Sequence, residues 1–308
     1  MKIIVAGLIN LETTVKIRQF PIEYYPIDYP FFGVMSTVSG VGMNLEKALL
    51  KLGDEAIIFA LTANDEVNSL INNELKKGKI KDDFIKPLLK ETPASVVLYD
   101  NSGRRQIYCD LKDWQDQIYP IDQKTIMAIK QSDAMIICNA NMNRPLLKVA
   151  KELGKLIISD VHVLANISDE YNRDFMENAD ILFLSDEAIS SSPYGFIKEL
   201  YNLYHNKIIV MGRGKFGSTI YLGDENIMYD VYSVNTREVI STVGAGDALL
   251  ASFVHFYLQN KDELDALKKA TLFASYKIGD KGAAKGFLSE NELLELASKY
   301  TVNAKRVY

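Results

Sequence analysis

The stretch Thr242-Val243-Gly244-Ala245-Gly246-Asp247 separates two segments of different character. A strand-like run, Ile227 to Val234, precedes it, and the segment from Ala248 to Leu258 that follows is apolar on nearly all sides. Such a segment suits a helix buried in the middle of a domain. The pattern therefore predicts a helix whose first turn begins at the glycines.

A helix start of this kind is suited to binding an anion. The unpaired amides of Gly244, Ala245 and Gly246 would carry partial positive charge, and glycine lets a ligand approach the backbone closely. Asp247 would lie beside that anion, where its carboxylate could take a proton from a hydroxyl while the amides hold a phosphoryl group. An ordinary helix-start aspartate after a glycine turn is equally compatible with this stretch alone.

A second glycine motif, Ser39-Gly40-Val41-Gly42-Met43-Asn44, lies near the N-terminus and precedes a helix-like run. The first stretch resembles the T-x-G-A-G-D signature of the ribokinase-like (PfkB) sugar kinases, and the second resembles that family's G-G-x-G-x-N element. The two motifs stand in the family's order, and the resemblance covers essentially the whole chain. It implies an α/β fold with a doubly wound, mostly parallel sheet flanked by helices, and a small β lid.

The composition excludes several other classes. The 308 residues include 35 Lys+Arg and 40 Asp+Glu, and the net charge of −5 gives no electrostatic case for nucleic acid or an anionic membrane. No stretch approaches the length of an apolar membrane helix. The two cysteines are unrelated in spacing and the three histidines are scattered, so neither a disulfide framework nor a zinc site is predicted, and we expect a cytoplasmic protein.

Strand-like and helix-like runs alternate along most of the chain, which predicts a parallel sheet flanked by helices. The first strand, Lys2 to Leu8, is apolar throughout and so is expected to be buried on both faces. We expect a single ribokinase-like domain over residues 1–308. The strand-like runs are Ala56–Leu61, Ala134–Cys138, Leu156–Asp160, Asp180–Leu184 and Lys207–Met211, and the helical runs include Asp65–Lys77, Arg144–Leu153 and Tyr194–Tyr204.

Polar residues directly after the first strand are candidates for binding substrate, because ligands of open α/β sheets bind at the carboxyl ends of the strands. The resemblance implies an aspartate here that holds two sugar hydroxyls, and this chain has Glu12 at the matching place, one methylene longer. The alternative for Glu12 is a solvated loop residue. The residues expected to bind substrate are Asn10, Glu12, Gly40, Gly42, Asn44 and Asp247.

Two segments interrupt the alternation and are expected to form the lid, over about residues 12–38 and 93–112. The segment from Phe20 to Phe32 is rich in Pro, Tyr and Phe, while Ser95–Tyr99 and Arg105–Cys109 predict a hairpin. A sheet this thin would leave one aromatic face exposed to solvent unless substrate or a second subunit buries it. We therefore expect a homodimer that pairs through the lid, as the resemblance also implies.

The run Gly212-Arg213-Gly214-Lys215-Phe216-Gly217 matches G-x-G-x-x-G after a strand, but the residues that follow it are strand-like, whereas a dinucleotide site needs a helix. No P-loop motif occurs. The resemblance implies instead that Gly214 and Gly217 lie beside ATP.

Other family positions match less closely. Ser241 stands where the family has Asp, and the family's N-x-x-E element falls on Ser185 to Ala188, where Asp186 and Glu187 could hold Mg²⁺ or be plain helix-start acids. The implied cofactors are ATP and Mg²⁺, and a monovalent cation is left open. The residues expected to bind the nucleotide are Ser185, Gly214, Gly217, Thr242, Gly244, Gly246 and Thr271.

The function predicted first is an ATP-dependent kinase that transfers the γ-phosphoryl group to a hydroxyl of a sugar or sugar-like molecule. In this interpretation Asp247 is the base, and Gly244, Ala245 and Gly246 hold the transferred charge. A nucleoside kinase, for example of the pseudouridine type, is the nearest alternative, because a hydrophobic Val41 would suit a base edge. A non-catalytic sugar- or nucleotide-binding protein on a kinase scaffold is a second alternative, and a nicotinamide oxidoreductase is a distant third.

Overall fold

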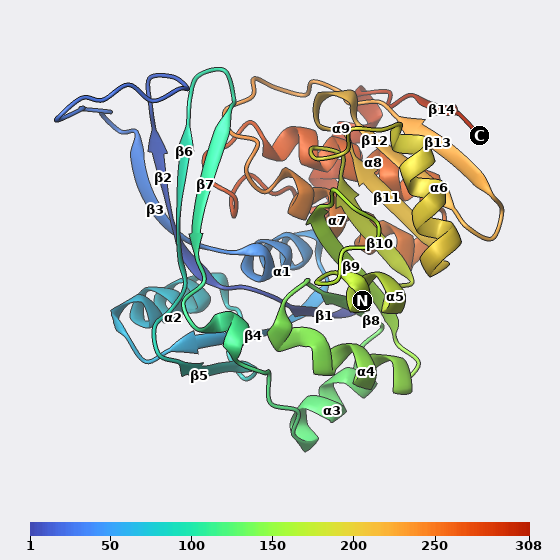
Figure 1. Cartoon of the computed structure of the whole chain (residues 1–308), viewed down its shortest axis with the longest axis horizontal. Helices are drawn as coiled ribbons and strands as arrows, with labels where there is room; N and C mark the ends of the chain where they lie inside the picture. The colour runs from blue at the N-terminus through green and yellow to red at the C-terminus, as the bar shows by residue number, and fades with distance from the viewer.

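The computed structural model describes residues 1–308 and is built on a ten-stranded sheet (Figure 1). From β11 to β5 all neighbouring strands are parallel, while β12, β13 and β14 add an antiparallel edge. In order across the sheet the strands are β14 (Ala304–Arg306), β13 (Ile227–Val231), β12 (Ser218–Leu222), β11 (Ile208–Gly212), β10 (Ile181–Ser185), β9 (Leu156–Val163), β8 (Ala134–Ile137), β1 (Lys2–Ala6), β4 (Glu55–Ala63) and β5 (Ile85–Leu89).

Helices cover both faces of this sheet, which confirms the doubly wound α/β prediction. Ile4 of β1 belongs to one large core cluster and Val5 to the other, because successive residues of a strand point to opposite faces. The first face is covered by α3 (Gln123–Gln131), α4 (Arg144–Glu152), α5 (Arg173–Asn178) and α6 (Pro193–Tyr204). The second is covered by α1 (Val41–Leu52), α7 (Ala245–Asn260), α8 (Glu263–Lys277) and α9 (Glu290–Lys299). The remaining helix, α2 (Glu66–Gly78), packs in a third cluster, and none of the helices could span a membrane.

The predicted central helix, α7, begins at the glycine stretch as expected. Gly244 is its N-cap and has a φ of 76°, a left-handed conformation that glycine adopts without strain. From Ala248 to Phe256 every side chain except that of Leu249 is buried, and the Phe253 ring lies edge-on against Phe183 of β10 with centroids 5.5 Å apart. The helix is therefore fixed against the sheet by its apolar length.

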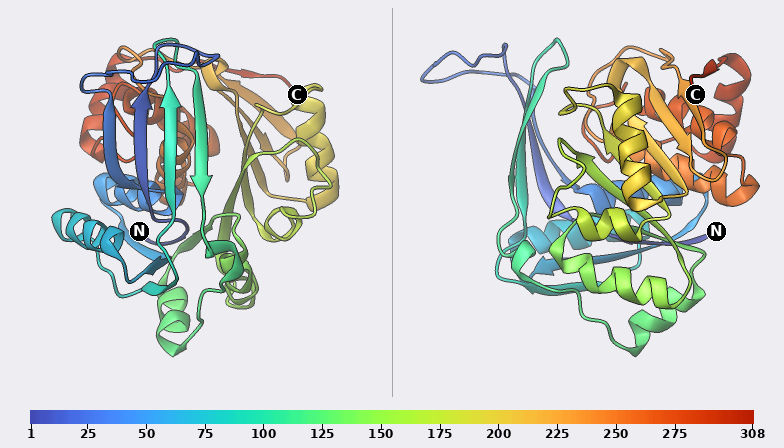
Figure 2. Two further views of the ribbon diagram at one scale, coloured as in Figure 1. Left: turned by 60° about the vertical axis from the view of Figure 1, so that its left-hand side comes forward. Right: turned by 45° about the vertical axis from the view of Figure 1, so that its right-hand side comes forward.

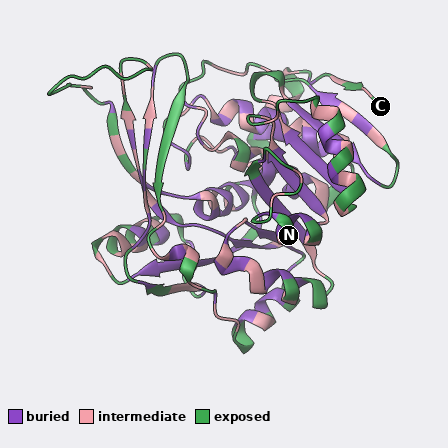
Figure 3. Cartoon of the chain, viewed as in Figure 1, coloured by how far each residue is buried: buried purple, intermediate pink, exposed green.

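A separate four-stranded sheet stands to one side of the body (Figures 1 and 2). We call it the small sheet; its order is β3 (Val34–Ser39), β2 (Asn10–Lys16), β6 (Ala94–Tyr99) and β7 (Arg105–Asp110), with β2 and β6 parallel. The predicted β6–β7 hairpin is confirmed. β7 is exposed along its whole length (Figure 3), whereas Val97 of β6 packs against Val243 and Ala283 in the body.

One detail of the sequence prediction was wrong here. The segment from Phe20 to Phe32 is not part of the sheet but an irregular connection between β2 and β3, because its three prolines lack the N–H that a strand must donate. Glu12 is buried within β2, so the alternative of a solvated loop residue is excluded.

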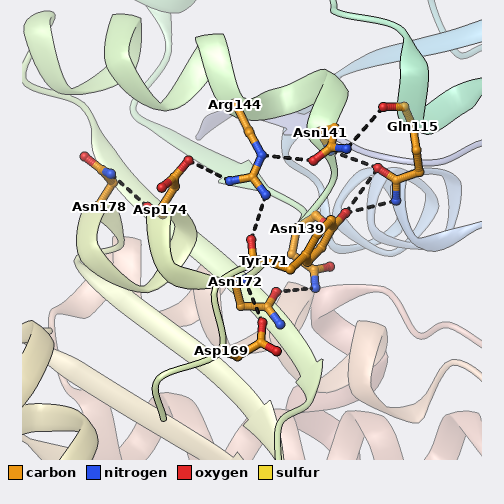
Figure 4. Close-up of polar contacts among 9 residues, drawn as sticks. All are labelled: Gln115, Asn139, Asn141, Arg144, Asp169, Tyr171, Asn172, Asp174 and Asn178. Atoms are coloured by element: carbon orange, nitrogen blue, oxygen red, sulfur yellow. Dashed lines mark hydrogen bonds and ion pairs between the residues drawn. The ribbon is translucent and has the colours of Figure 1, made fainter. Parts of the chain in front are cut away.

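A polar network anchors the end of the small sheet to the body (Figure 4). Gln115, in the short helix η1 (Trp114–Asp116) that follows β7, donates to the Tyr171 hydroxyl at 2.9 Å and accepts from the Asn141 amide at 3.1 Å. The Tyr171 hydroxyl also donates to the Asn139 carbonyl at 2.9 Å, just beyond β8. Arg144 donates to the Tyr171 carbonyl at 2.7 Å. These bonds hold η1, the end of β8 and the loop before α5 together.

Candidate active site

The two glycine motifs meet at Asp247, in the first turn of α7. Asn44 of α1 donates to Asp247 Oδ2 at 2.7 Å, and the Ser39 hydroxyl donates to Asn44 Oδ1 at 3.1 Å. Burial raises the pKa of Asp247 above its ordinary value, and the hydrogen bond from Asn44 opposes that rise. The result is an oriented carboxylate that is better suited to accept a proton than a free aspartate.

The backbone next to Asp247 offers three unpaired amides. Ala245 donates its N–H to the Thr242 carbonyl at 3.2 Å, so this amide, which the sequence pattern included in the anion site, is already used. The N–H groups of Gly244, Gly246 and Asp247 have no acceptor. The free amides therefore include that of Asp247 in place of Ala245, and Gly244 and Gly246 remain as predicted.

Gly40 and Gly42 are needed for close packing. A Cβ on Gly40 would lie 2.5 Å from the Leu8 carbonyl oxygen, and one on Gly42 would lie 2.7 Å from the Gly7 carbonyl carbon. The Gly42 amide donates to the Leu8 carbonyl at 3.0 Å, so it is not free for a ligand. These glycines let α1 start directly against the end of β1, and direct contact with substrate stays a prediction.

The small sheet contributes polar atoms that have no partner. Asn10 Oδ1, Glu12 Oε1 and Thr37 Oγ1 are all buried without a hydrogen bond, although Asn10 Nδ2 donates to Ser95 at 2.9 Å. Burial raises the Glu12 pKa and the nearby Asp247 charge adds to that rise, while the Ala283 backbone amide opposes it. Buried polar atoms are seldom left unpaired, so this group indicates a site for a polar ligand.

His162 also faces this region. It lies at a bulge of β9 in a left-handed conformation, with φ 55°, and its backbone amide donates to Asp160 at 2.8 Å. The imidazole is 45% exposed and forms an ion pair with Asp160 across 3.4 Å. The Asp160 carboxylate raises the His162 pKa to about 9, and the His162 charge in turn lowers the pKa of Asp247. Strain of this kind in the backbone is typical of functional positions.

Arg105, at the start of β7, connects the small sheet to the body. Its guanidinium donates to the Thr242 hydroxyl at 2.6 Å and to Glu187 at 3.3 Å. A cation is thereby held beside the anion-binding amides and beside one of the predicted metal ligands.

Of the other residues predicted to bind the nucleotide, some are open to a ligand and some are already used in packing or hydrogen bonds within the protein. Gly214 has φ 53° and faces open space, whereas a Cβ on Gly217 would lie 2.0 Å from the Val231 carbonyl oxygen, so Gly217 is needed for packing. The Thr271 hydroxyl donates within α8 to the Leu267 carbonyl at 2.8 Å, and the Ser185 hydroxyl accepts from the Glu187 amide at 3.3 Å. The strand β12 follows Gly217, which agrees with the rejection of a dinucleotide motif.

Asp186 and Glu187 lie side by side after β10, and each has a basic neighbour. Arg213 lies 3.9 Å from Asp186, and Arg105 lies 3.3 Å from Glu187. Burial raises the pKa of Asp186, and Arg213 opposes that rise. No group of three or more His, Cys, Asp or Glu side chains forms a metal cage.

Residues 31–290 match the family model described as pfkB family carbohydrate kinase. The chain belongs to this family. It is 23% identical over 267 residues to the fructosamine kinase FrlD of Bacillus subtilis (strain 168), which covers 85% of this chain and 89% of that protein. It is 24% identical over 263 residues to the ribokinase of the same strain, which covers 84% of this chain and 87% of that protein.

Solved structures share the fold across almost the whole chain. The microbiome-derived acarbose kinase Mak1 has a TM-score of 0.85 at 20% identity, and the match covers 96% of this chain and 98% of the other. The ribokinase from Giardia lamblia has a TM-score of 0.83 at 16% identity and covers 97% and 99%. The ribokinase-like fold is confirmed, as are the predicted enzyme class, a phosphotransferase with an alcohol acceptor, and the predicted activity, that of a sugar kinase.

The comparisons favour a sugar kinase over the nucleoside alternative. Val41, the hydrophobic residue that suggested a nucleoside, is half-buried at the start of α1 and packs against both large core clusters.

Three residues of this region were missed from the sequence. His162 could have been found, because it follows the predicted strand Leu156–Asp160 at the edge where ligands bind. Arg105 gave a weaker signal, as a cation next to the predicted hairpin turn. Lys277 gave none, because a basic residue in the last turn of a helix is ordinary.

The charge on His162 should make stability depend on pH. Because the folded-state pKa is raised to about 9 from an ordinary 6.5, the stabilisation is complete below pH 6.5 and is lost as the pH rises through 9. The difference in free energy of unfolding between the wild type and His162→Gln, measured in urea, should therefore shrink from pH 6 to pH 10.

His205 is the matched control for this measurement, because its φ is 56° and no carboxylate forms an ion pair with it. His205→Gln measures the effect of replacing a histidine in the same left-handed conformation without a carboxylate partner. A pH-independent difference for His162→Gln would contradict the assignment of its charge to the Asp160 pair.

Proposed function

We propose that this protein transfers the γ-phosphoryl group of ATP to a hydroxyl of a small sugar or sugar derivative, with Asp247 as the general base. The observation that carries the proposal is the set of unpaired acceptors in the small sheet, Asn10 Oδ1 and Glu12 Oε1, together with the Asp247 carboxylate. Acceptors without donors suit a ligand that brings several hydroxyl groups. The named activities of relatives, on fructosamine, ribose and deoxyribose, support a sugar.

The transferred phosphoryl group would be held by the free amides of Gly244, Gly246 and Asp247 at the start of α7. These amides are fixed before the reaction, so they stabilise the developing charge without reorganisation. Arg105 adds a positive charge next to them. ATP would enter from the side of β11, where Gly214 leaves the backbone open.

The carboxylates of Asp186 and Glu187 are suitable ligands for the Mg²⁺ ion that accompanies ATP in phosphate-transferring enzymes. Mg²⁺ is usually held by one or two carboxylates together with substrate phosphates, and Asp186 and Glu187 provide two oxygen ligands close to Arg105. Mg²⁺, when bound, would neutralise charge on the phosphates of ATP. Asp247 takes the proton of the acceptor hydroxyl, and Asn44 keeps the carboxylate aimed at it.

We propose that the small sheet acts as a lid over the sugar and pairs with a second copy of this chain. The aromatic side chains of the β2–β3 connection support this, because Phe31 is 85% exposed and Phe32 is 97% exposed. Exposed apolar groups gathered in one segment often mark a surface that binds a partner. The two free cysteines, Cys109 and Cys138, support a reducing, cytoplasmic location.

Asp247→Asn should abolish turnover and leave nucleotide binding nearly unchanged. Loss of a general base typically lowers the rate by about 10² to 10⁴. Steady-state kinetics with an ATP-consumption assay over a panel of sugars checks the rate, and calorimetric titration with ATP checks binding. If Asp247→Asn retains more than about a tenth of the wild-type kcat, Asp247 is not the general base.

Glu12→Gln should raise the KM for the sugar and leave the KM for ATP unchanged. A charged hydrogen bond contributes roughly 1.5 to 3 kcal/mol, which corresponds to about a 10- to 100-fold change in KM. Glu46→Gln is the matched control, because Glu46 is also buried with an unpaired oxygen, and burial raises its pKa to about 8. If both variants alter both KM values alike, Glu12 does not contact the sugar.

The paired substitution Phe31→Lys and Phe32→Lys should convert a dimer to a monomer. A stable interface buries on the order of 1,200 to 2,000 Å², and two charges at its apolar centre would oppose that burial. Sedimentation velocity at micromolar concentration measures the oligomeric state. Leu203→Lys, which changes an exposed apolar residue on α6, should leave the dimer intact; a wild-type monomer would refute the pairing.

A further inference from the structure

Lys277 is the last residue of α8 and is completely buried, with 0% of its surface exposed. The carboxylates of Asp247, Glu12 and Asp280 act on its ammonium group only from beyond hydrogen-bond distance. Its Nζ donates instead to two backbone carbonyls, that of Val243 and that of Gly282, the second at 2.9 Å. Burial lowers its pKa to about 8, and the negative charges of Asp247, Glu12 and Asp280 oppose that fall, so the charged form still dominates at pH 7. A buried ammonium held only by carbonyl oxygens is unusual, because burying a charge is costly unless it is paired.

The first carbonyl belongs to the peptide that joins Val243 to Gly244. A trans peptide is planar, so its C=O and N–H point in opposite directions. With the Val243 carbonyl turned toward Lys277, the Gly244 N–H must face away from it, and this N–H is one of the unpaired amides of the anion site. The ammonium thus fixes the direction of an anion-binding group.

The second carbonyl belongs to the peptide that joins Gly282 to Ala283. Its N–H likewise faces away from Lys277, and the Ala283 amide is the group that opposes the effect of burial on Glu12. The same loop packs on the glycine stretch, because a Cβ on Gly244 would lie 2.7 Å from the Ala283 carbonyl oxygen. One cation therefore contacts both the phosphoryl side and the sugar side of the site.

We propose that the ammonium of Lys277 is a built-in cation that orients the Val243–Gly244 and Gly282–Ala283 peptides, so that the enzyme needs no bound monovalent ion. Lys277 is a positioning residue in this proposal, and the proposal rests on the kinase function given above. Carbonyl oxygens pointing at one position are the ligands that K⁺ binds in proteins. A space left by the lysine side chain should therefore accept K⁺ or NH₄⁺.

The first experiment uses the wild-type enzyme. Its kcat and both KM values should agree within twofold in potassium, sodium and tetramethylammonium chloride at equal ionic strength, since tetramethylammonium is too large for a carbonyl site. A decrease in kcat of more than tenfold when potassium is replaced by tetramethylammonium would overturn the proposal. This measurement does not depend on whether any variant folds.

The second experiment removes the charge. Lys277→Ala should lose at least about 10² in kcat, the cost of one misplaced oxyanion donor, and its KM for the sugar should rise. Ammonium chloride or potassium chloride should raise the kcat of Lys277→Ala at least tenfold, whereas tetramethylammonium chloride should not. Retained activity, or a loss that neither small cation changes, would overturn the proposal. Lys269→Met, a charge removed from the same helix, should stay within twofold of wild type.

Binding of a non-hydrolysable ATP analogue separates this proposal from the kinase function itself. In calorimetric titrations Lys277→Ala should bind the analogue more weakly than wild type, and ammonium should restore the affinity. This readout needs no turnover, so it remains valid if no sugar in the panel is phosphorylated. Equal affinity of the two proteins in tetramethylammonium would count against a role for Lys277 in the anion site.

Discussion

The hydrogen bond between Asn44 and Asp247 joins the starts of two helices, α1 and α7, that pack on the same face of the sheet. Helix starts carry partial positive charge, and the amides that remain free at this point are those of α7, because the Gly42 amide of α1 already donates to the Leu8 carbonyl. Gly40 and Gly244 make this meeting possible, because a side chain at either position would collide with backbone. The active site is thus a consequence of how closely these two helices can begin beside the strands.

The charges around this point are balanced within a small volume. Asp247, Glu12 and Asp160 supply negative charge, and Lys277, His162 and Arg105 supply positive charge from three different elements. The buried members, Asp247, Glu12 and Lys277, interact with one another, so removing one of them changes the pKa values of the other two. The raised pKa of Asp247 and the raised pKa of His162 are therefore properties of the group and not of single residues.

The sequence was sufficient for features that depend on local pattern. The start of α7 followed from a change in apolar periodicity at Gly244, and the β6–β7 hairpin followed from alternation on either side of a polar turn. The sequence left open whether Glu12 faces substrate or lies in a solvated loop, because only the pairing of β2 with β3 and β6 shows that its side chain is buried. The role of Lys277 could not be predicted from the sequence, because it donates to the backbone carbonyls of Val243 and Gly282. Every residue has a backbone carbonyl, so a sequence motif cannot reveal such a contact.

The network of Gln115, Tyr171 and Asn141 fixes only one end of the small sheet (Figure 4). Asn10 and Glu12 lie on β2 near that attached end, whereas Arg105 lies at the far end, beside the hairpin turn. In a rotation about the attached end, displacement grows with distance from the pivot. The far end meets the body through Arg105, which donates to Thr242 and Glu187. Any rotation about the attached end would therefore disturb these two contacts far more than it would move Asn10 and Glu12.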